Sequence, residues 1–190
     1  MKSIMTSVSP YLCGKITNGQ CKMLVRKSAP KEVPFKAYIY CTKTKNKWML
    51  SDYEGAYQNS VGEIVYAQQH VIGEFICDKV EVLFNTNGNP ENYMTDILPT
   101  VLQKTALSFK EFQDYVGSRS DKNNIYGWHI SDLKIYDKPK ELSEFGRKCD
   151  YASEIHCRDC LFLGDWDSCC GVMCKPLTRP PQSYMFVEEV

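Results

Sequence analysis

The fold is decided by a short stretch, NGQCKMLVRK, at residues 18–27. Before it, Ser9 stands at a typical N-cap position and Pro10 at the first position of a helix, so a helix is predicted to about Thr17. Asn18-Gly19 ends this helix, because these residues accept the left-handed backbone that often follows a last turn. Residues 21–26 are mostly apolar and predict a strand. A helix is thus followed directly by a strand.

Further strands are predicted on both sides of this stretch. Residues 35–42 (FKAYIYCT) give the clearest one, since Phe35, Ala37, Ile39 and Cys41 alternate with tyrosines. Other strands are predicted at residues 3–8, 71–84, 125–136 and 183–187, and residues 43–60 are expected to form a long loop or an irregular hairpin.

A second helix and several turns complete the sequence pattern. Ser108 and Glu111 have the spacing of a capping box, which predicts a helix that buries Phe109, Phe112 and Val116 and ends at Gly117. Turns are expected at residues 85–90 and 137–139. The order of these elements is that of a mixed α+β chain and fits a small mixed β-barrel with two or three packed helices.

Composition narrows the class of protein. The chain has 190 residues, 43% of them hydrophobic, which is enough for one domain with a real core. No apolar run approaches the length of a membrane span, and residues 1–10 lack the apolar stretch of a secretory signal. A cytoplasmic protein that does not enter the membrane is therefore expected.

The net charge of zero conceals two halves of opposite sign. Residues 1–50 contain nine Lys and one Arg against Glu32 alone, a net charge of +9, so residues 51–190 carry −9. Lys43, Lys45 and Lys47 alternate in a polar segment that is expected to be exposed. Two faces of opposite sign would follow, the basic one suited to a polyanion. Alternatively, the two halves attract each other and cancel.

The ten cysteines point to a metal site. Six of them lie between residues 149 and 174, and Cys157-Arg158-Asp159-Cys160 is a CxxC pair of the kind that holds zinc. Cys170 and Cys174 are predicted to complete a structural site of four sulfurs, with Cys169, Cys149 and His156 as alternative ligands. An iron–sulfur cluster, free thiols and disulfides are the competing interpretations.

The stretch at residues 18–27 resembles the motif that follows the first helix of ASCH domains, a branch of the PUA-like superfamily. Three further segments are similar to this family, especially to its phage and prophage members. They lie at residues 71–80 (VIGEFICDKV), 127–145 (GWHISDLKIYDKPKELSEF) and 176–189 (PLTRPPQSYMFVEE). The resemblance implies an ASCH barrel at residues 1–146 and a last barrel strand at 179–190, and the cysteine pattern predicts a zinc-binding segment between them, at 147–178.

The resemblance also implies the position of a catalytic site, but this sequence lacks the family's catalytic residues there. Some relatives are amidohydrolases that remove the acyl group of N4-acetylcytidine with a Lys, a Thr and a Glu. Those positions correspond here to Cys21, Leu24 and a residue near Thr105, so none of the three is retained. Amide hydrolysis needs an activated nucleophile and a base. No catalytic residue is therefore assigned, and whether the chain is an enzyme stays open, with binding favoured.

Basic and aromatic residues are the candidates for binding nucleic acid. Arg26 offers a planar fork for phosphate or for stacking on a base, although an ion pair with Glu74 would also explain it. Bases stack on aromatic faces, so Trp128 and Tyr184 are predicted to contact them, and Trp48 and Phe186 are further candidates for this role. The full predicted set is Lys22, Arg26, Lys27, Lys43, Lys45, Lys47, Trp128 and Tyr184.

Three functions follow from the sequence. The favoured one is a module that binds nucleic acid, RNA rather than DNA, with an unstacked base in the cleft of the barrel. The second is a hydrolase or nuclease acting on a modified nucleotide or RNA, which would need a cluster of His and carboxylates. His70, His129 and His156 are scattered instead. The third is a phage-encoded module that binds or inhibits a host protein.

Overall fold

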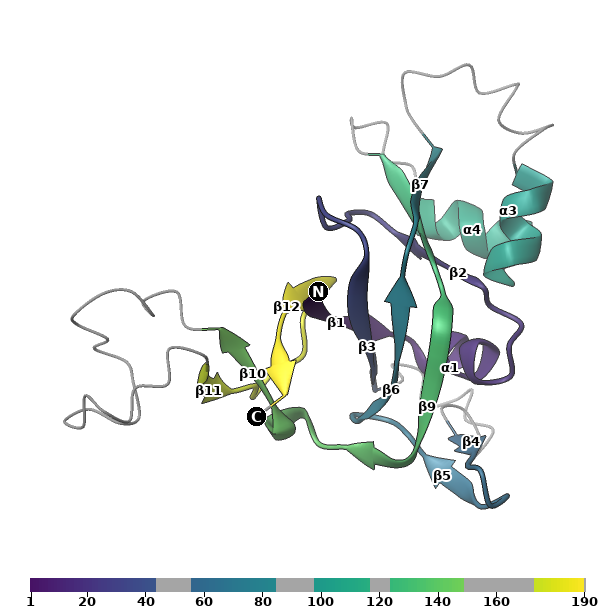
Figure 1. Cartoon of the computed structure of the whole chain (residues 1–190). Helices are drawn as coiled ribbons and strands as arrows, with labels where there is room; N and C mark the ends of the chain where they lie inside the picture. Colours follow the sequence, from purple (N-terminus) through teal and green to yellow (C-terminus); the bar gives the residue numbers. More distant parts are fainter. Residues whose placement is uncertain (44–55, 85–97, 117–123, 149–172, 190) are drawn as a thin grey trace.

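The structure is a computed structural model that describes residues 1–43, 56–84, 98–116, 124–148 and 173–189. Its centre is a five-stranded sheet in the order β12-β1-β3-β6-β9 (Figure 1). These strands span Tyr184–Phe186, Lys2–Val8, Phe35–Cys41, Val71–Cys77 and Ser131–Lys140. β1 runs parallel to β3, and every other neighbouring pair in this sheet is antiparallel. Both faces of β3 are buried, with Phe35 and Ile39 on one side and Tyr38 and Tyr40 on the other.

A second sheet of three strands has the order β2-β8-β7, with bounds Met23–Arg26, Ile125–His129 and Val80–Phe84. Helices α3 (Leu98–Thr105) and α4 (Phe109–Val116) lie near it (Figure 1). Met23, Val25 and Leu83 of this sheet form a core cluster with Val101 of α3 and Phe112 of α4. Helix α1 (Pro10–Thr17) belongs to the main core, which it enters through Cys13 and Ile16.

Smaller elements complete the described chain. β4 (Ala56–Gln58) and β5 (Ile64–Tyr66) form a hairpin. The 3-10 helix η2 (Leu142–Glu144) leads into β10 (Phe145–Lys148), which pairs with β11 (Met173–Pro176) and β13 (Glu188–Glu189). β10 and β11 thus pair on either side of residues 149–172, which lie outside the described residues.

The mixed α+β class is confirmed, but the strands do not close into the predicted single barrel. The described strands form four separate sheets, and the two long arms divide between two of them. One arm, residues 71–84, is interrupted after Cys77, and the other, residues 125–140, at Ile130. Before and after these breaks the arms pair in different sheets, and the His129 N–H donates to the Lys79 carbonyl at the junction, 3.0 Å away.

Gly73 shows why the first arm contains a glycine. The β6 register shifts beside it against both neighbouring strands. A Cβ at this position would collide with the carbonyl oxygen of Lys134 and lie 3.1 Å from Ile135 Cα. The close approach of β9 therefore requires glycine here.

Several local predictions can now be compared with the structure. Helix α1 begins at Pro10, and the Ser9 hydroxyl accepts from the Leu12 N–H, as predicted. The turn predicted at residues 137–139 is wrong, because these residues continue β9. Pro139 is tolerated there since β9 is at the edge of its sheet. The predicted burial of Phe109 is also wrong: its side chain stands at the start of α4 and is 44% exposed.

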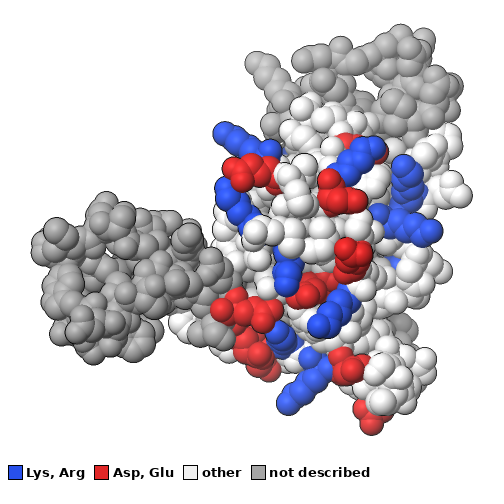
Figure 2. All heavy atoms as spheres, in the orientation of Figure 1, with Lys and Arg blue, Asp and Glu red and all other residues white. Residues whose placement is uncertain are grey.

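Charges are mixed on the surface. Figure 2 shows basic and acidic side chains interspersed over the face that carries β3, β6 and β9. Lys36 of the basic half and Glu74 of the acidic half form one pair between these elements, with 3.5 Å between Nζ and Oε1. This pair is one contact of the kind expected if the two halves attract each other. No helix among the described residues is long and apolar enough to span a membrane.

Candidate functional site: a cavity between α1, β2 and α4

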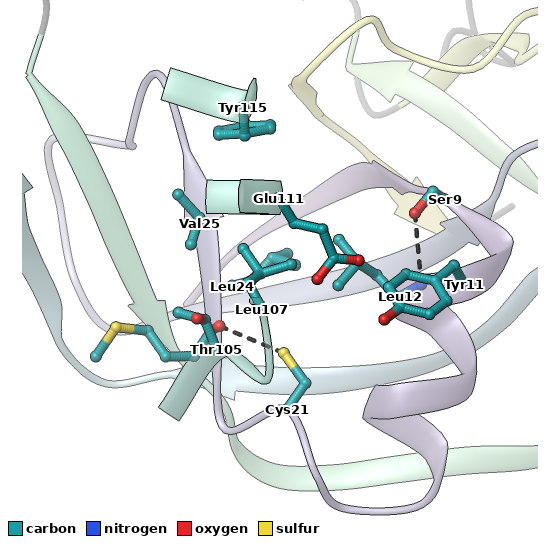
Figure 3. Close-up of a pocket in the computed structure, with 11 residues that line it drawn as sticks. Ser9, Tyr11, Leu12, Cys21, Leu24, Val25, Thr105, Leu107, Glu111 and Tyr115 are labelled. Carbon is teal, nitrogen blue, oxygen red and sulfur yellow. Dashed lines mark hydrogen bonds between the residues drawn. The ribbon is translucent and has the colours of Figure 1, made fainter. Parts of the chain in front are cut away.

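One cavity of about 160 Å³ lies where α1, β2 and α4 meet (Figure 3). We call it the helix cavity. This volume suits one ring-sized group rather than a large ligand. Eleven residues line it: Ser9, Tyr11, Leu12, Cys21, Met23, Leu24, Val25, Thr105, Leu107, Glu111 and Tyr115.

The cavity brings together the three positions that the resemblance singled out. Cys21, Leu24 and Thr105 all line it, although Thr105 is more than 80 residues further along the chain than the other two. They meet because the Lys22 N–H donates to the Lys104 carbonyl, 2.8 Å away, which joins the end of α3 to the start of β2. The three positions that the resemblance singles out therefore lie together at one cavity, although the family's Lys, Thr and Glu are replaced there by Cys21, Leu24 and Thr105.

The three side chains are poorly suited to hydrolysis. Burial raises the pKa of the Cys21 thiol, which donates to the Met23 carbonyl at 3.3 Å. The Thr105 hydroxyl donates within its own helix to the Val101 carbonyl, 2.8 Å away. Leu24 is apolar and buried. Among the described residues, these three positions therefore offer neither an activated nucleophile nor a general base.

The rim of the cavity is aromatic and carries basic side chains. Tyr11 is 43% exposed, and Lys15 Nζ lies 4.2 Å from the centre of its ring. Tyr115 of α4 has Lys27 Nζ 5.0 Å from its ring centre. Both distances are within the range of cation–π attraction. Sequence reasoning selected Lys27 but missed Lys15 and both tyrosines.

Glu111 is the single carboxylate among the residues that line the helix cavity. Its Oε2 accepts from the backbone N–H and the hydroxyl of Ser108, each 2.8 Å away, and the Glu111 N–H donates to Ser108 Oγ at 3.2 Å. This is the capping box that the sequence predicts. The Ser108 backbone N–H, followed by the Ser108 and Tyr11 hydroxyls, lowers the pKa of Glu111, so it is ionised at neutral pH. In Figure 3 its carboxylate points toward Tyr11.

Arg26 lies beside the cavity but beneath the surface. Only 7% of it is exposed, and its Nη2 donates to the Ser7 carbonyl at 2.7 Å. Its Cζ is 5.9 Å from the centre of the Trp128 ring. Burial lowers the pKa of Arg26, which the Tyr115 hydroxyl partly offsets. The alternative ion pair with Glu74 is wrong, because Glu74 instead accepts from the Tyr136 hydroxyl at 2.7 Å and pairs with Lys36.

The other predicted binding residues are dispersed. Lys22 and Lys43 are exposed and do not line the cavity. Trp128 is fully buried and packs against Phe35 and Tyr184, so its ring is not exposed for a base to stack on. Lys45, Lys47 and Trp48 lie outside the described residues, as do the metal candidates Cys157, Cys160 and Cys170.

Metal ligands cannot be assembled from the described part of the chain. Cys174 belongs to β11, but the structure does not describe its side chain. The alternative ligands Cys149, His156 and Cys169 lie in residues 149–172, outside the described residues. No group of three or more His, Cys, Asp or Glu residues in the described ranges could hold a metal ion. His129 instead pairs with Glu81, with 3.0 Å between Nε2 and Oε1.

Comparison with solved structures identifies the fold. The crystal structure of the ASCH protein from Zymomonas mobilis aligns with a TM-score of 0.54 and 14% sequence identity, over 98% of this chain and 88% of that one. The chain has the ASCH fold. A Tyr-to-Phe variant of the same protein aligns with a TM-score of 0.53 and 15% identity, over 99% of this chain and 91% of that chain. No protein-family model and no curated protein matches the sequence.

Proposed function

We propose that this protein is a PUA-like module that binds single-stranded RNA and receives one unstacked base in the helix cavity. The observation that carries the proposal is a ring-sized cavity whose two rim tyrosines each lie next to a lysine. Bases stack on aromatic faces for about 1–3 kcal/mol each, and lysines beside such a platform can contact the phosphates.

The ASCH fold and the position of the cavity support this function. The cavity lies where the resemblance places the nucleotide site of the family, with Cys21, Leu24 and Thr105 around it. Glu111 adds a hydrogen-bond acceptor at the rim, which suits a base with an exocyclic amino group such as cytosine. Binding without hydrolysis is consistent with the apolar Leu24 and the unactivated Cys21.

The first test is binding of labelled single-stranded RNA, measured by fluorescence anisotropy across a salt series with matched DNA beside it. We expect affinity for RNA that falls as salt rises, because phosphate contacts release counterions. Lys27→Ala should reduce the salt slope by about one, whereas Lys138→Ala, an exposed lysine on β9 away from the cavity, should leave it unchanged. No binding at any salt would overturn the proposal and favour a protein partner.

A second test separates base insertion from simple phosphate binding. Leu107 is half-buried at the cavity, so Leu107→Trp should fill it. Affinity for RNA should then fall roughly 5-fold or more, the value of one lost stacking contact. Tyr66→Trp is the matched control, because Tyr66 is 66% exposed on β5. Equal affinities for both variants would mean that no base enters the helix cavity.

We also propose a structural zinc site in the cysteine-rich segment, held by Cys157, Cys160, Cys170 and Cys174. The spacing of these residues supports zinc, and a closed set of four sulfurs would stabilise the fold without taking part in chemistry. Four cysteines of the described residues, Cys13, Cys21, Cys41 and Cys77, are buried free thiols, which suits the reducing cytosol. Metal analysis should find one zinc per chain, and Cys160→Ser should abolish it while Cys77→Ser should not.

A further inference from the structure

A second cavity, of about 320 Å³, lies at the edge of the five-stranded sheet where β12 pairs with β1. We call it the β12 cavity. It is larger than the helix cavity and shares no residue with it. Seven residues line it: Lys2, Pro30, Lys31, Glu32, Phe35, Tyr184 and Phe186.

The wall of the β12 cavity is an aromatic platform with firm support. Phe186 is 48% exposed, although it is a large apolar side chain. Its ring meets Tyr184 edge to face, with 6.3 Å between the ring centres, and Tyr184 packs in turn on the buried Trp128 at 5.4 Å. Such rings lose little conformational freedom when a ligand binds, because the core already fixes them.

The charges around this platform favour an anion. Lys2 and Lys31 stand against Glu32, which is the single acidic residue among residues 1–50, so the lining has a net charge of +1. Lys2 Nζ is 5.9 Å from the Phe186 ring centre and 2.9 Å from Glu32 Oε2. The side chains of this ion pair are 58% and 70% exposed, so the pair is weak and a phosphate can replace the carboxylate.

The two cavities are joined through the core. Tyr115 of the helix cavity interacts with Arg26, Arg26 lies over Trp128, and Trp128 packs on Tyr184 of the β12 cavity. The backbone also connects them, since residues 26–27 border the first cavity and residues 30–32 line the second. Ser28 Oγ lies 3.3 Å from Ser183 Oγ, which fixes this segment beside the start of β12.

We infer that the β12 cavity is a second base-stacking subsite, which holds another nucleotide of the same RNA strand on Phe186 with its phosphate at Lys2 and Lys31. This inference rests on the proposed function, because it takes the strand in the helix cavity as its starting point. Aromatic faces combined with nearby cations are the usual elements of single-strand binding.

Photo-cross-linking tests the two sites separately. An oligouridine of about ten nucleotides, a length within the site sizes of small single-strand binders, is substituted with 5-iodouracil and irradiated with the full-length protein. Mass spectrometry then identifies the linked aromatic residues. We expect links at Tyr184 or Phe186 in addition to Tyr11 or Tyr115. Links at the helix cavity alone would overturn the second subsite and leave the proposed function standing.

Two substitutions at the β12 cavity should change the affinity for RNA in opposite directions. Phe186→Ala should weaken oligouridine binding roughly 5-fold to 100-fold, as for one lost stacking contact. The matched control is Phe109→Ala, because Phe109 is similarly exposed and lines neither cavity. Glu32→Gln should instead strengthen binding several-fold, since it frees Lys2 and removes a charge that repels phosphate. Unchanged affinity in both Phe186→Ala and Glu32→Gln would overturn the inference.

Discussion

The helix cavity and the β12 cavity differ in what holds them together. The helix cavity is formed by short segments, α1, β2 and α4, whose ends are fixed by caps and by a few backbone hydrogen bonds. The β12 cavity lies on a sheet that joins the two ends of the chain, since β12 pairs with β1. The first should therefore respond to changes in helix caps, and the second to changes in the sheet.

Trp128→Ala should have the largest effect, because Trp128 packs on Tyr184 of the β12 cavity and lies next to Arg26, which interacts with Tyr115 of the helix cavity. Its side chain is fully buried and contacts Phe35, Tyr184 and Arg26. Truncation of a buried tryptophan costs about 3–5 kcal/mol of unfolding free energy. Urea denaturation followed by circular dichroism measures this loss. Tyr66→Ala on the exposed β5 hairpin should change it by less than about 0.5 kcal/mol. A comparable loss in both variants would mean that Trp128 is not the shared support of the two cavities.

Gly73→Ala should act on the five-stranded sheet that carries the β12 cavity, at its β6–β9 pair. The new methyl group meets the Lys134 backbone, which cannot move without opening the β6–β9 pairing. A loss of about 1–3 kcal/mol in unfolding free energy is expected, as for other overpacked sites.

Gly14→Ala in α1 is the matched control for this substitution. A Cβ at Gly14 would meet nothing within 4 Å, so alanine should stabilise the helix by about 0.5–1 kcal/mol. If Gly73→Ala lowers the unfolding free energy while Gly14→Ala raises it, the close approach of β9 to Gly73 is supported. A neutral Gly73→Ala would show that β6 and β9 separate more easily than the structure indicates.

Ser108→Ala should lower the local stability around the helix cavity more than that around the β12 cavity. Ser108 caps α4, which carries Tyr115 and Glu111 to the rim. Loss of such a cap costs about 1 kcal/mol. Hydrogen exchange should show faster exchange in α4 while β1 and β12 are unchanged, and Ser143→Ala, at an exposed serine of η2, should alter neither region. Faster exchange at β12 as well would mean that the two regions open together.

The sequence predicted the local elements better than the contacts between them. Helix α1, strand β3 and the Ser108–Glu111 box follow from residues close together in the chain, so their patterns are visible without the fold. The pairing of β1 with β12 joins residues about 180 positions apart, and no local pattern indicates it. Tyr184 and Phe186 were therefore recognised as aromatic candidates, while Lys2 and Lys31, their neighbours in space, were not.

The same distinction explains the helix cavity. Cys21, Leu24 and Thr105 could be located because the family resemblance supplied their positions. Tyr115 could not, because its role depends on the packing of α4 against β2, which brings it to Lys27 and Arg26. Arg26 was predicted as a phosphate ligand from its chemistry, but its burial comes from its place on a strand covered on both faces.

The smallest expected effect concerns how the unfolding free energy changes with pH, to which Glu111 at the helix cavity contributes. Ser108 lowers the pKa of Glu111 below the usual value of about 4.3, so the ionised carboxylate stabilises the folded state above that pH. This contribution is lost as the pH falls through the lowered pKa. Glu111→Gln should therefore reduce the unfolding free energy at neutral pH by roughly 0.3–1 kcal/mol, and the difference from the original protein should disappear in more acidic solution.

Thermal unfolding at a series of pH values measures this difference, with Asp114→Asn as the control for loss of a negative charge from the same helix. Asp114 is exposed on α4 and does not line the cavity. If both variants lose the same stability at every pH, the net charge of α4 matters and the capping contact does not. If only Glu111→Gln shows the pH-dependent loss, the carboxylate that caps α4 also holds the rim of the helix cavity in place, a dependence that the β12 cavity does not share.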